Sequence, residues 1–270
     1  MRIVEDHAEE LQDPSLHALN RPSKAKKELP ALVAVSKKVG KAIVDFKMIS
    51  EGDKIAVAVS GGKDSLSLMH VLRHRQRVSP VNFDFTVVHI DFGFEGFNPE
   101  VLGDYFKKHR FPYFIEKADA FKGKRDQDID CFWCSWNRRK ALFQLADREG
   151  FTKVAFGHHL DDIAETIVLN QFYRGEIGAM KPKQELFDGK IVIIRPLAYV
   201  REREMEYLAK KLNIASVGQP KCAKGDRSHR MKIRKMLRAF EENNPMVVTN
   251  IFRSLQKVRS DYLIDDPTQP

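Results

Sequence analysis

The feature that most constrains the fold of this chain is the alternation of short apolar runs with helical segments between residues 54 and 173. Four runs rich in β-branched and aromatic residues have the length of buried strands: residues 54–59, 83–90, 112–117 and 152–157. Segments with apolar residues at helical spacing follow them: residues 65–76, 99–109, 135–150 and 159–173. Crossovers of this length join parallel strands. The pattern therefore predicts an α/β fold, with a mostly parallel sheet covered by helices on both faces.

Different patterns flank this region. The first 28 residues are polar, contain two prolines and show no periodicity, so we expect a mobile tail there. An amphipathic helix is predicted from Ala31, a hairpin around Asp188 and Gly189, and helices after Arg201. The expected organisation is a tail, a main α/β domain, a basic helical region and a second tail, at residues 1–28, 29–200, 201–260 and 261–270.

The composition excludes several classes of protein. No uncharged stretch approaches the roughly 20 apolar residues that a membrane helix needs. The acidic N-terminus lacks the apolar region of a signal peptide. Three cysteines are too few, and odd in number, for a disulfide scaffold, which indicates a reducing compartment. We therefore expect a cytoplasmic protein with no membrane partner.

The positive charge is concentrated near the C-terminus. The net charge is +9, and 15 Lys and Arg stand against 6 Asp and Glu between residues 201 and 260. One predicted helix alone would spread six cations over a broad face: Arg227, Arg230, Lys232, Arg234, Lys235 and Arg238. Such a cluster of cations is typical either of a solvated helical surface or of a protein that binds a polyanion such as RNA through its phosphates.

A glycine pair follows the first predicted strand, in the hexapeptide Ser60-Gly-Gly-Lys-Asp-Ser65. Here, backbone N–H groups and the start of a helix can hold an anion, and the two serines add donors. The loop fits neither the Walker A pattern nor the dinucleotide pattern. Asp64 adds a negative charge beside a polyphosphate, which is favourable only if it holds Mg²⁺. The alternative is a tight turn with incidental polar residues.

The hexapeptide resembles the pyrophosphate loop of the ATP-pyrophosphatase (PP-loop) superfamily, whose members cleave ATP between the α and β phosphates. The resemblance implies an adenine nucleotide alpha hydrolase-like fold, with residues 29–200 as the ATP-binding domain. It also implies that ATP is bound by the loop residues, namely Ser60, Gly61, Gly62, Lys63, Asp64 and Ser65.

The three cysteines form a second constellation. Cys131 and Cys134 are three residues apart at a predicted helix start, so both thiolates can reach one metal, and Cys222 stands alone. A structural zinc site is one interpretation, with His229 or Asp226 as the fourth ligand. A redox disulfide and incidental buried thiols are the others.

The order of several motifs narrows this choice. They are Cys131-Phe-Trp-Cys134-Ser-Trp-Asn-Arg138-Arg139, Gly157-His158-His159-Leu-Asp161-Asp162, Arg195-Pro196-Leu197-Ala198-Tyr199 and Cys222. This succession resembles the tRNA 2-thiocytidine synthetases (tRNA-cytidine 2-sulfurtransferases) over roughly residues 30–260. It departs from that family around Cys222, where the family often has P-C-x-x-C and this chain has one cysteine.

The resemblance implies that Cys131, Cys134 and Cys222 hold a [4Fe–4S] cluster whose fourth iron has no protein ligand and can carry a sulfide. The cysteine count agrees with this hypothesis. Three thiolates leave one iron open, since four normally saturate a cluster, and no cysteine remains to carry a persulfide.

The motif at residues 157–162 opens a predicted helix at the sheet edge that holds the loop. The adjacent carboxylates of Asp161 and Asp162 are costly unless they pair with a cation or with the helix N-terminus. The resemblance assigns Gly157, His158 and Asp162 to the ATP site, and we expect one of the two aspartates to be essential for catalysis.

Two further elements complete the expected site. Arg138, on the helix that starts at the cysteine pair, is expected to neutralise phosphate charge during catalysis, unless it is a solvated surface residue. Main-chain groups at Ala58 and Ile90, near the ends of the first two strands, are expected to hydrogen-bond adenine.

The function that we expect is ATP- and Mg²⁺-dependent thiolation of tRNA. ATP would adenylate O2 of an anticodon-loop cytidine, and sulfur from the [4Fe–4S] cluster would then give 2-thiocytidine. The expected partners are tRNA, a cysteine desulfurase or other sulfur donor, and a second copy in a homodimer. The alternatives are another PP-loop enzyme, for uridine thiolation or lysidine-type amine ligation, and a non-catalytic nucleotide- or RNA-binding protein.

Overall fold

The computed structural model describes residues 28–93, 98–118, 131–214 and 229–264, with only the main chain for residues 131 and 132. The chain divides into two compact units. The first contains the residues up to His159 and those from Lys181 through helix α7, and the second contains Leu160–Met180 and helices α8 and α9. Within the described ranges, every helix is too short or too polar to span a lipid bilayer.

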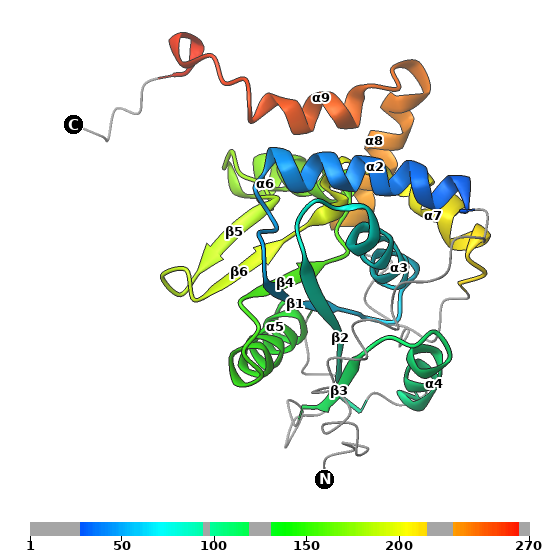
Figure 1. The fold of residues 1–270 in the computed structure, drawn as a ribbon. Helices are drawn as coiled ribbons and strands as arrows, with labels where there is room; N and C mark the ends of the chain where they lie inside the picture. Colours follow the sequence, from blue (N-terminus) through cyan, green and yellow to red (C-terminus); the bar gives the residue numbers. More distant parts are fainter. Residues whose placement is uncertain (1–27, 94–97, 119–130, 215–228, 265–270) are drawn as a thin grey trace. The chain divides into compact units, whose positions relative to one another are not determined.

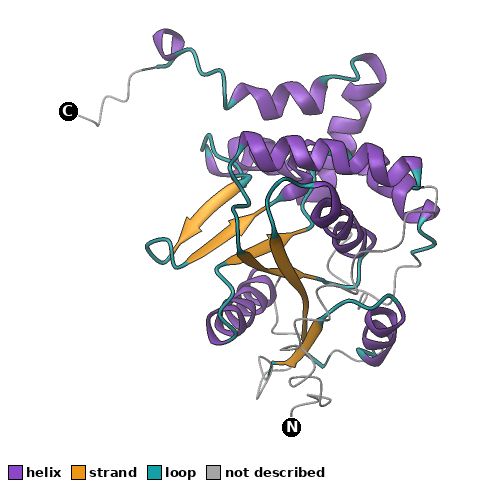
Figure 2. Ribbon diagram, in the orientation of Figure 1, coloured by secondary structure: helices purple, strands orange, loops and turns teal. Residues whose placement is uncertain are grey.

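A six-stranded sheet forms the centre of the first unit (Figures 1 and 2), in the order β3-β2-β1-β4-β6-β5. Its strands are β1 (Asp53–Ala58), β2 (Phe83–Asp91), β3 (Tyr113–Lys117), β4 (Lys153–Phe156), β5 (Lys183–Leu186) and β6 (Ile191–Ile194). All neighbours pair in parallel except β5 and β6. The predicted α/β fold with a mostly parallel sheet is therefore confirmed.

The antiparallel pair at one edge is the hairpin expected around Asp188 and Gly189. Phe187, Asp188 and Gly189 have successive positive φ values of 53°, 54° and 86°. The Gly189 N–H donates to the Leu186 carbonyl at 3.2 Å, which closes the turn. Asp and Gly tolerate this left-handed conformation, and its twist suits a hairpin.

Two hydrophobic cores flank the sheet, because successive strand residues point to opposite faces. On β1, Ile55 and Val57 enter the larger core and Ala56 enters the smaller one. The larger core receives side chains from α2 (Pro30–Asp45), α3 (Lys63–Val78), α4 (Glu100–Lys108) and α7 (Glu202–Lys211). The smaller one receives those of α5 (Cys131–Arg148). Helices therefore cover both faces, as predicted.

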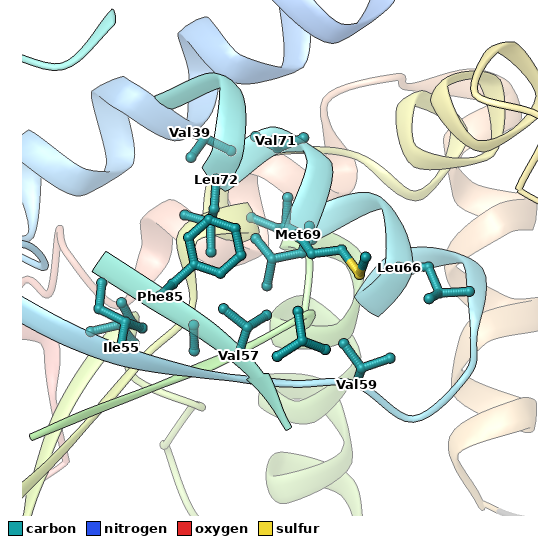
Figure 3. Close-up of a cluster of buried hydrophobic side chains, with 14 of the residues drawn as sticks. Val39, Ile55, Val57, Val59, Leu66, Met69, Val71, Leu72 and Phe85 are labelled. Carbon is teal, nitrogen blue, oxygen red and sulfur yellow. The ribbon is translucent and has the colours of Figure 1, made fainter. Parts of the chain in front are cut away.

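The larger core holds α3 firmly on the sheet. Leu72 and Met69 of α3 are completely buried and lie over Val57 and Phe85 (Figure 3). Truncating such a side chain costs about 2–5 kcal/mol of stability, so Leu72→Ala is expected to loosen α3. Because the loop after β1 runs directly into α3, this packing also fixes the loop.

In its described residues, the second unit contains three α-helices, α6 (Leu160–Arg174), α8 (His229–Asn243) and α9 (Val247–Ser254), and a short 3-10 helix at Ser260–Tyr262. Val168 of α6 and the pair Ile233 and Leu237 of α8 form its small buried core. Pro245 lies between α8 and α9, where it cannot continue a helix.

The two units do not follow the order of the sequence, since α6 groups with the C-terminal helices and α7 with the sheet. The boundaries proposed from composition, after residues 28, 200 and 260, remain a prediction. The stretch 119–130, expected to be a loop, lies outside the described residues.

Candidate active site

The loop between β1 and α3 lies at the carboxyl end of the central parallel strands. Gly61 has a φ of +89°, a conformation that suits glycine, and Gly62 is the N-cap of α3. The Ser60 N–H donates to Ser65 Oγ at 3.2 Å, and Ser65 Oγ donates to the Gly62 carbonyl at 3.0 Å. The second serine thus fixes the curvature of the loop, and the loop leads into a helix N-terminus that favours an anion.

Lys63 and Asp64 begin α3 and pair with each other. Lys63 Nζ lies 3.1 Å from Asp64 Oδ2 and 3.9 Å from Glu202 Oε1, at the start of α7. Their side chains remain 31% and 26% exposed, so both can be reached by a ligand. The Glu202 contact joins residues 139 positions apart and has no local signal in the sequence.

Gly157, directly after β4, approaches the same loop closely. A Cβ added to Gly157 would lie 3.1 Å from both the Cα and the backbone nitrogen of Ser65. Only glycine fits this approach without a shift of backbone. His158 and His159 follow, the first half-buried beside the Phe156 ring and the second almost fully buried.

The end of β2 reaches the same edge. His89 is buried, and its Nδ1 lies 2.7 Å from the Val59 carbonyl oxygen, so the proton is on Nδ1. Burial lowers the pKa of His89; the Val59 carbonyl opposes this shift, and the charge of Arg138 adds to it. A neutral His89 therefore links β2 to Val59, just before residues 60–65, the candidate phosphate loop.

The two expected adenine-binding positions lie on neighbouring strands. Ala58 ends β1, where it pairs with Val88 of β2 and Phe156 of β4. Ile90 is buried near the end of β2 and pairs with Glu116 of β3. The register places both at the carboxyl edge, one on each of two adjacent strands.

Arg138 extends from α5 toward the end of β2. Its guanidinium carbon lies 5.4 Å from the centre of the Phe92 ring, and its buried Nε has no hydrogen-bond partner in the described part of the chain. Within the first unit, the positive charge of Arg138 acts on His89 and helps to lower its pKa.

The proposed metal ligands are described only in part. α5 starts at Cys131, and Cys134 has a half-buried free thiol in the first turn of that helix. These positions share a helix face, which fits two ligands of one metal group. The side chain of Cys131 and all of Cys222 lie outside the described residues, and the remaining described residues form no His, Cys, Asp and Glu cluster suited to a metal.

The expected acidic pair lies in the second unit, in the first turn of α6. Asp161 is 9% exposed, and Asp162 Oδ1 lies 3.7 Å from Arg234 and 4.0 Å from Arg230 of α8. These arginines supply positive charge that offsets the cost of neighbouring carboxylates. The sequence alone did not indicate this pairing.

Arg234 makes its main contact with Glu165, one turn further along α6. Arg234 Nε donates to Glu165 Oε1 at 2.6 Å, and Nη2 to Oε2 at 3.3 Å. Burial raises the pKa of Glu165, and the arginine opposes this shift. Arg234 therefore packs α8 against α6, a role that neither expectation for the cations of this helix, a solvated surface or a contact with RNA, includes. Lys232, Lys235 and Arg238 of the same helix are exposed, and Arg227 lies outside the described residues.

Comparison with known proteins adds to this geometry. A family model described as a PP-loop domain matches residues 32–241. A tRNA-cytidine(32) 2-sulfurtransferase of Geobacter metallireducens is 40% identical over 86% of this chain and 92% of its own length. One from Geobacter sulfurreducens is 38% identical over 84% of this chain and 90% of its own length.

A solved structure shares the fold. The U34-tRNA thiolase NcsA from Methanococcus maripaludis, determined with its [4Fe-4S] cluster, superposes with a TM-score of 0.72 at 23% identity. The match covers 88% of this chain and 81% of the thiolase. At this identity, the likeness supports the α/β fold.

Proposed function

The chain belongs to the tRNA-cytidine 2-sulfurtransferase family of PP-loop proteins, and on this premise we propose that it uses ATP to replace O2 of a tRNA cytidine with sulfur. The family resemblance expected from the sequence is thereby confirmed. The observation that carries the proposal is the phosphate loop at the carboxyl end of β1, which Gly157, the residue directly after β4, approaches closely.

ATP would bind along the carboxyl edge of the sheet. Main-chain groups at Ala58 and Ile90 would contact adenine, and the loop Ser60–Ser65 would hold the β and γ phosphates. Lys63 would leave its resting pair with Asp64 and turn its ammonium group toward the phosphates. Gly157 keeps the wall of this pocket free of a side chain, and His158 follows it.

Asp64 would hold Mg²⁺ beside the departing pyrophosphate. A carboxylate oxygen is a ligand that Mg²⁺ prefers, and Asp64 is accessible at the loop. O2 of cytidine would attack the α-phosphorus, and pyrophosphate would leave with its charge stabilised by the loop donors and the metal. We expect Arg138 and one of Asp161 and Asp162 to assist this step.

Cys131, Cys134 and Cys222 would hold a [4Fe–4S] cluster. When bound, the cluster would supply the sulfur that reaches C2 of the adenylated base. A C2–S bond then forms, the C2–O bond breaks, and AMP leaves with the former O2. The half-buried thiol of Cys134, one turn from Cys131 on α5, supports this donor set.

The substrate would be a cytidine presented unstacked from an anticodon loop, because duplex RNA hides the reactive edges of its bases. The exposed cations Lys232, Lys235 and Arg238 support binding to the tRNA backbone. We further propose a cytoplasmic location, a cysteine desulfurase or similar sulfur donor, and a homodimer.

The test uses the whole chain purified without oxygen. Pyrophosphate release is measured with ATP and Mg²⁺, with and without bulk tRNA, and the tRNA nucleosides are then analysed by mass spectrometry. We expect tRNA-dependent release, about four irons per chain and formation of 2-thiocytidine. A colourless protein with one zinc would contradict the cluster. ATP cleavage without any thionucleoside would contradict sulfur transfer.

A further inference from the structure

A buried arginine in the first unit has no role in the mechanism above. Arg195 directly follows β6 and is only 4% exposed. Its Nη1 donates to the Lys181 carbonyl at 2.5 Å, whereas its Nε is buried without a hydrogen-bond partner. Within the described ranges, no carboxylate forms an ion pair with Arg195.

This arrangement is unfavourable in the absence of an anion. A guanidinium that leaves water normally gains a carboxylate or several acceptors in return, and Arg195 has one carbonyl. Burial, together with the charge of nearby Arg139 on α5, lowers the pKa of Arg195 to about 10. Two positive charges are thus neighbours where a counter-charge is expected.

The position in the sheet suggests what the counter-charge is. β6 is parallel to β4, and β4 to β1, so Arg195 follows its strand at the same edge as the phosphate loop. Neighbouring strands lie about 4.8 Å apart, which puts the ends of β1 and β6 about 10 Å from each other. Open α/β sheets bind ligands at this carboxyl edge.

We propose that Arg195, assisted by Arg139, binds a phosphate group at the carboxyl end of β6. The planar guanidinium can donate two parallel hydrogen bonds to phosphate oxygens, which would satisfy its buried donor and its charge together. The inference rests on the proposed function, because both of its substrates, ATP and tRNA, bring phosphates. Which of them supplies the group is decided by experiment.

The test compares the whole chain with Arg195→Met, Arg195→Lys and the control Arg203→Met, since Arg203 is an exposed arginine on α7. One arm measures Mg·ATP binding by calorimetry without tRNA. The other measures binding of labelled tRNA by anisotropy at several salt concentrations, without nucleotide. Neither arm depends on turnover, so a protein that binds as expected but makes no 2-thiocytidine would contradict the proposed function alone.

We expect Arg195→Met to weaken the binding of one ligand about tenfold. Arg195→Lys should weaken the binding of the same ligand about threefold, because lysine keeps the charge but lacks the two parallel N–H donors of the guanidinium. A loss confined to Mg·ATP assigns the phosphate to the nucleotide. A loss confined to tRNA, with a salt dependence reduced by about one phosphate contact, assigns it to the tRNA backbone.

The proposal is overturned if both Arg195 variants bind both ligands as tightly as Arg203→Met. In that case, Arg195 is a structural residue, and Arg195→Met would lose only stability toward urea in the absence of ligands. Should Arg195→Met fail to fold, the affinities of Arg195→Lys decide between the two outcomes.

Discussion

The Cα of Ser65 lies so close to Gly157 that a single added carbon would stand 3.1 Å from it. The contact joins the phosphate loop to the end of β4, and its partner atoms are backbone. A larger side chain at position 157 would therefore displace the backbone of the loop. The closeness of these two residues makes the loop geometry sensitive to a methyl group.

Gly157→Ala is expected to weaken ATP binding about tenfold and to destabilise the protein by about 1–3 kcal/mol, the usual cost of overpacking a tight contact. Calorimetry with Mg·ATP and urea unfolding measure the two effects. The control is Gly103→Ala in α4, where the added carbon meets side chains at 3.5 Å or more. Unchanged affinity in Gly157→Ala would show that the loop does not bind ATP.

Asp64→Asn is expected to reduce pyrophosphate release at least a hundredfold without a change in melting temperature. It removes the charge of the proposed Mg²⁺ ligand at a partly exposed position and keeps the size of the side chain. Asp84→Asn, an exposed change on β2, serves as the control. Wild-type release by Asp64→Asn would exclude Asp64 as the metal ligand.

His70 makes stability depend on pH. Its Nε2 lies 2.8 Å from Tyr105 Oη, and burial, with the charges of His109 and Arg73, lowers its pKa to about 4. Between pH 6.5 and 4, the unfolded chain binds a proton there and the folded chain does not. Stability should therefore fall as the pH drops through this window, by about 3 kcal/mol in total.

Urea unfolding at pH 7 and pH 4.5 checks this prediction. His70→Gln keeps a polar group beside Tyr105 but cannot titrate, so its stability should depend less on pH by roughly that amount. An equal loss of stability on acidification in the wild type and in His70→Gln would show that His70 is not the group responsible.

Arg234 and Glu165 are expected to be strongly coupled. Arg234→Met leaves a carboxylate buried without its bidentate partner and should cost about 3 kcal/mol. Glu165→Gln together with Arg234→Met should recover part of that loss. A double-mutant cycle in urea measures the coupling, with Lys232→Met, at an exposed position of the same helix, as the control. Coupling below about 0.5 kcal/mol would contradict a buried ion pair.

The elements of the sheet could be predicted because their signals are local. The alternating strand and helix patterns predict a mostly parallel sheet, and Asp188 with Gly189 marks the position of the hairpin. The phosphate loop was equally visible, since its residues are contiguous and their chemistry depends on position after a strand. Its family then followed from the order of motifs along the chain.

The long-range ion pairs could not be predicted. Lys63 meets Glu202, and Arg234 meets Glu165, only because packing brings distant helices together. In the sequence, Arg234 was one of six cations on a helix, and charge spacing alone does not distinguish a surface residue from a buried one. For the same reason, the sequence does not show that Arg195 is buried, although the motif Arg195–Tyr199 is visible in it.

The central claim is that this chain makes 2-thiocytidine in tRNA, and the nucleoside composition of bulk tRNA tests it most directly. Mass spectrometry should show that 2-thiocytidine disappears when the gene is deleted, returns with the wild-type gene and stays absent with Asp64→Asn, while other thionucleosides are unchanged. An unaltered level of 2-thiocytidine in the deletion strain would contradict the account.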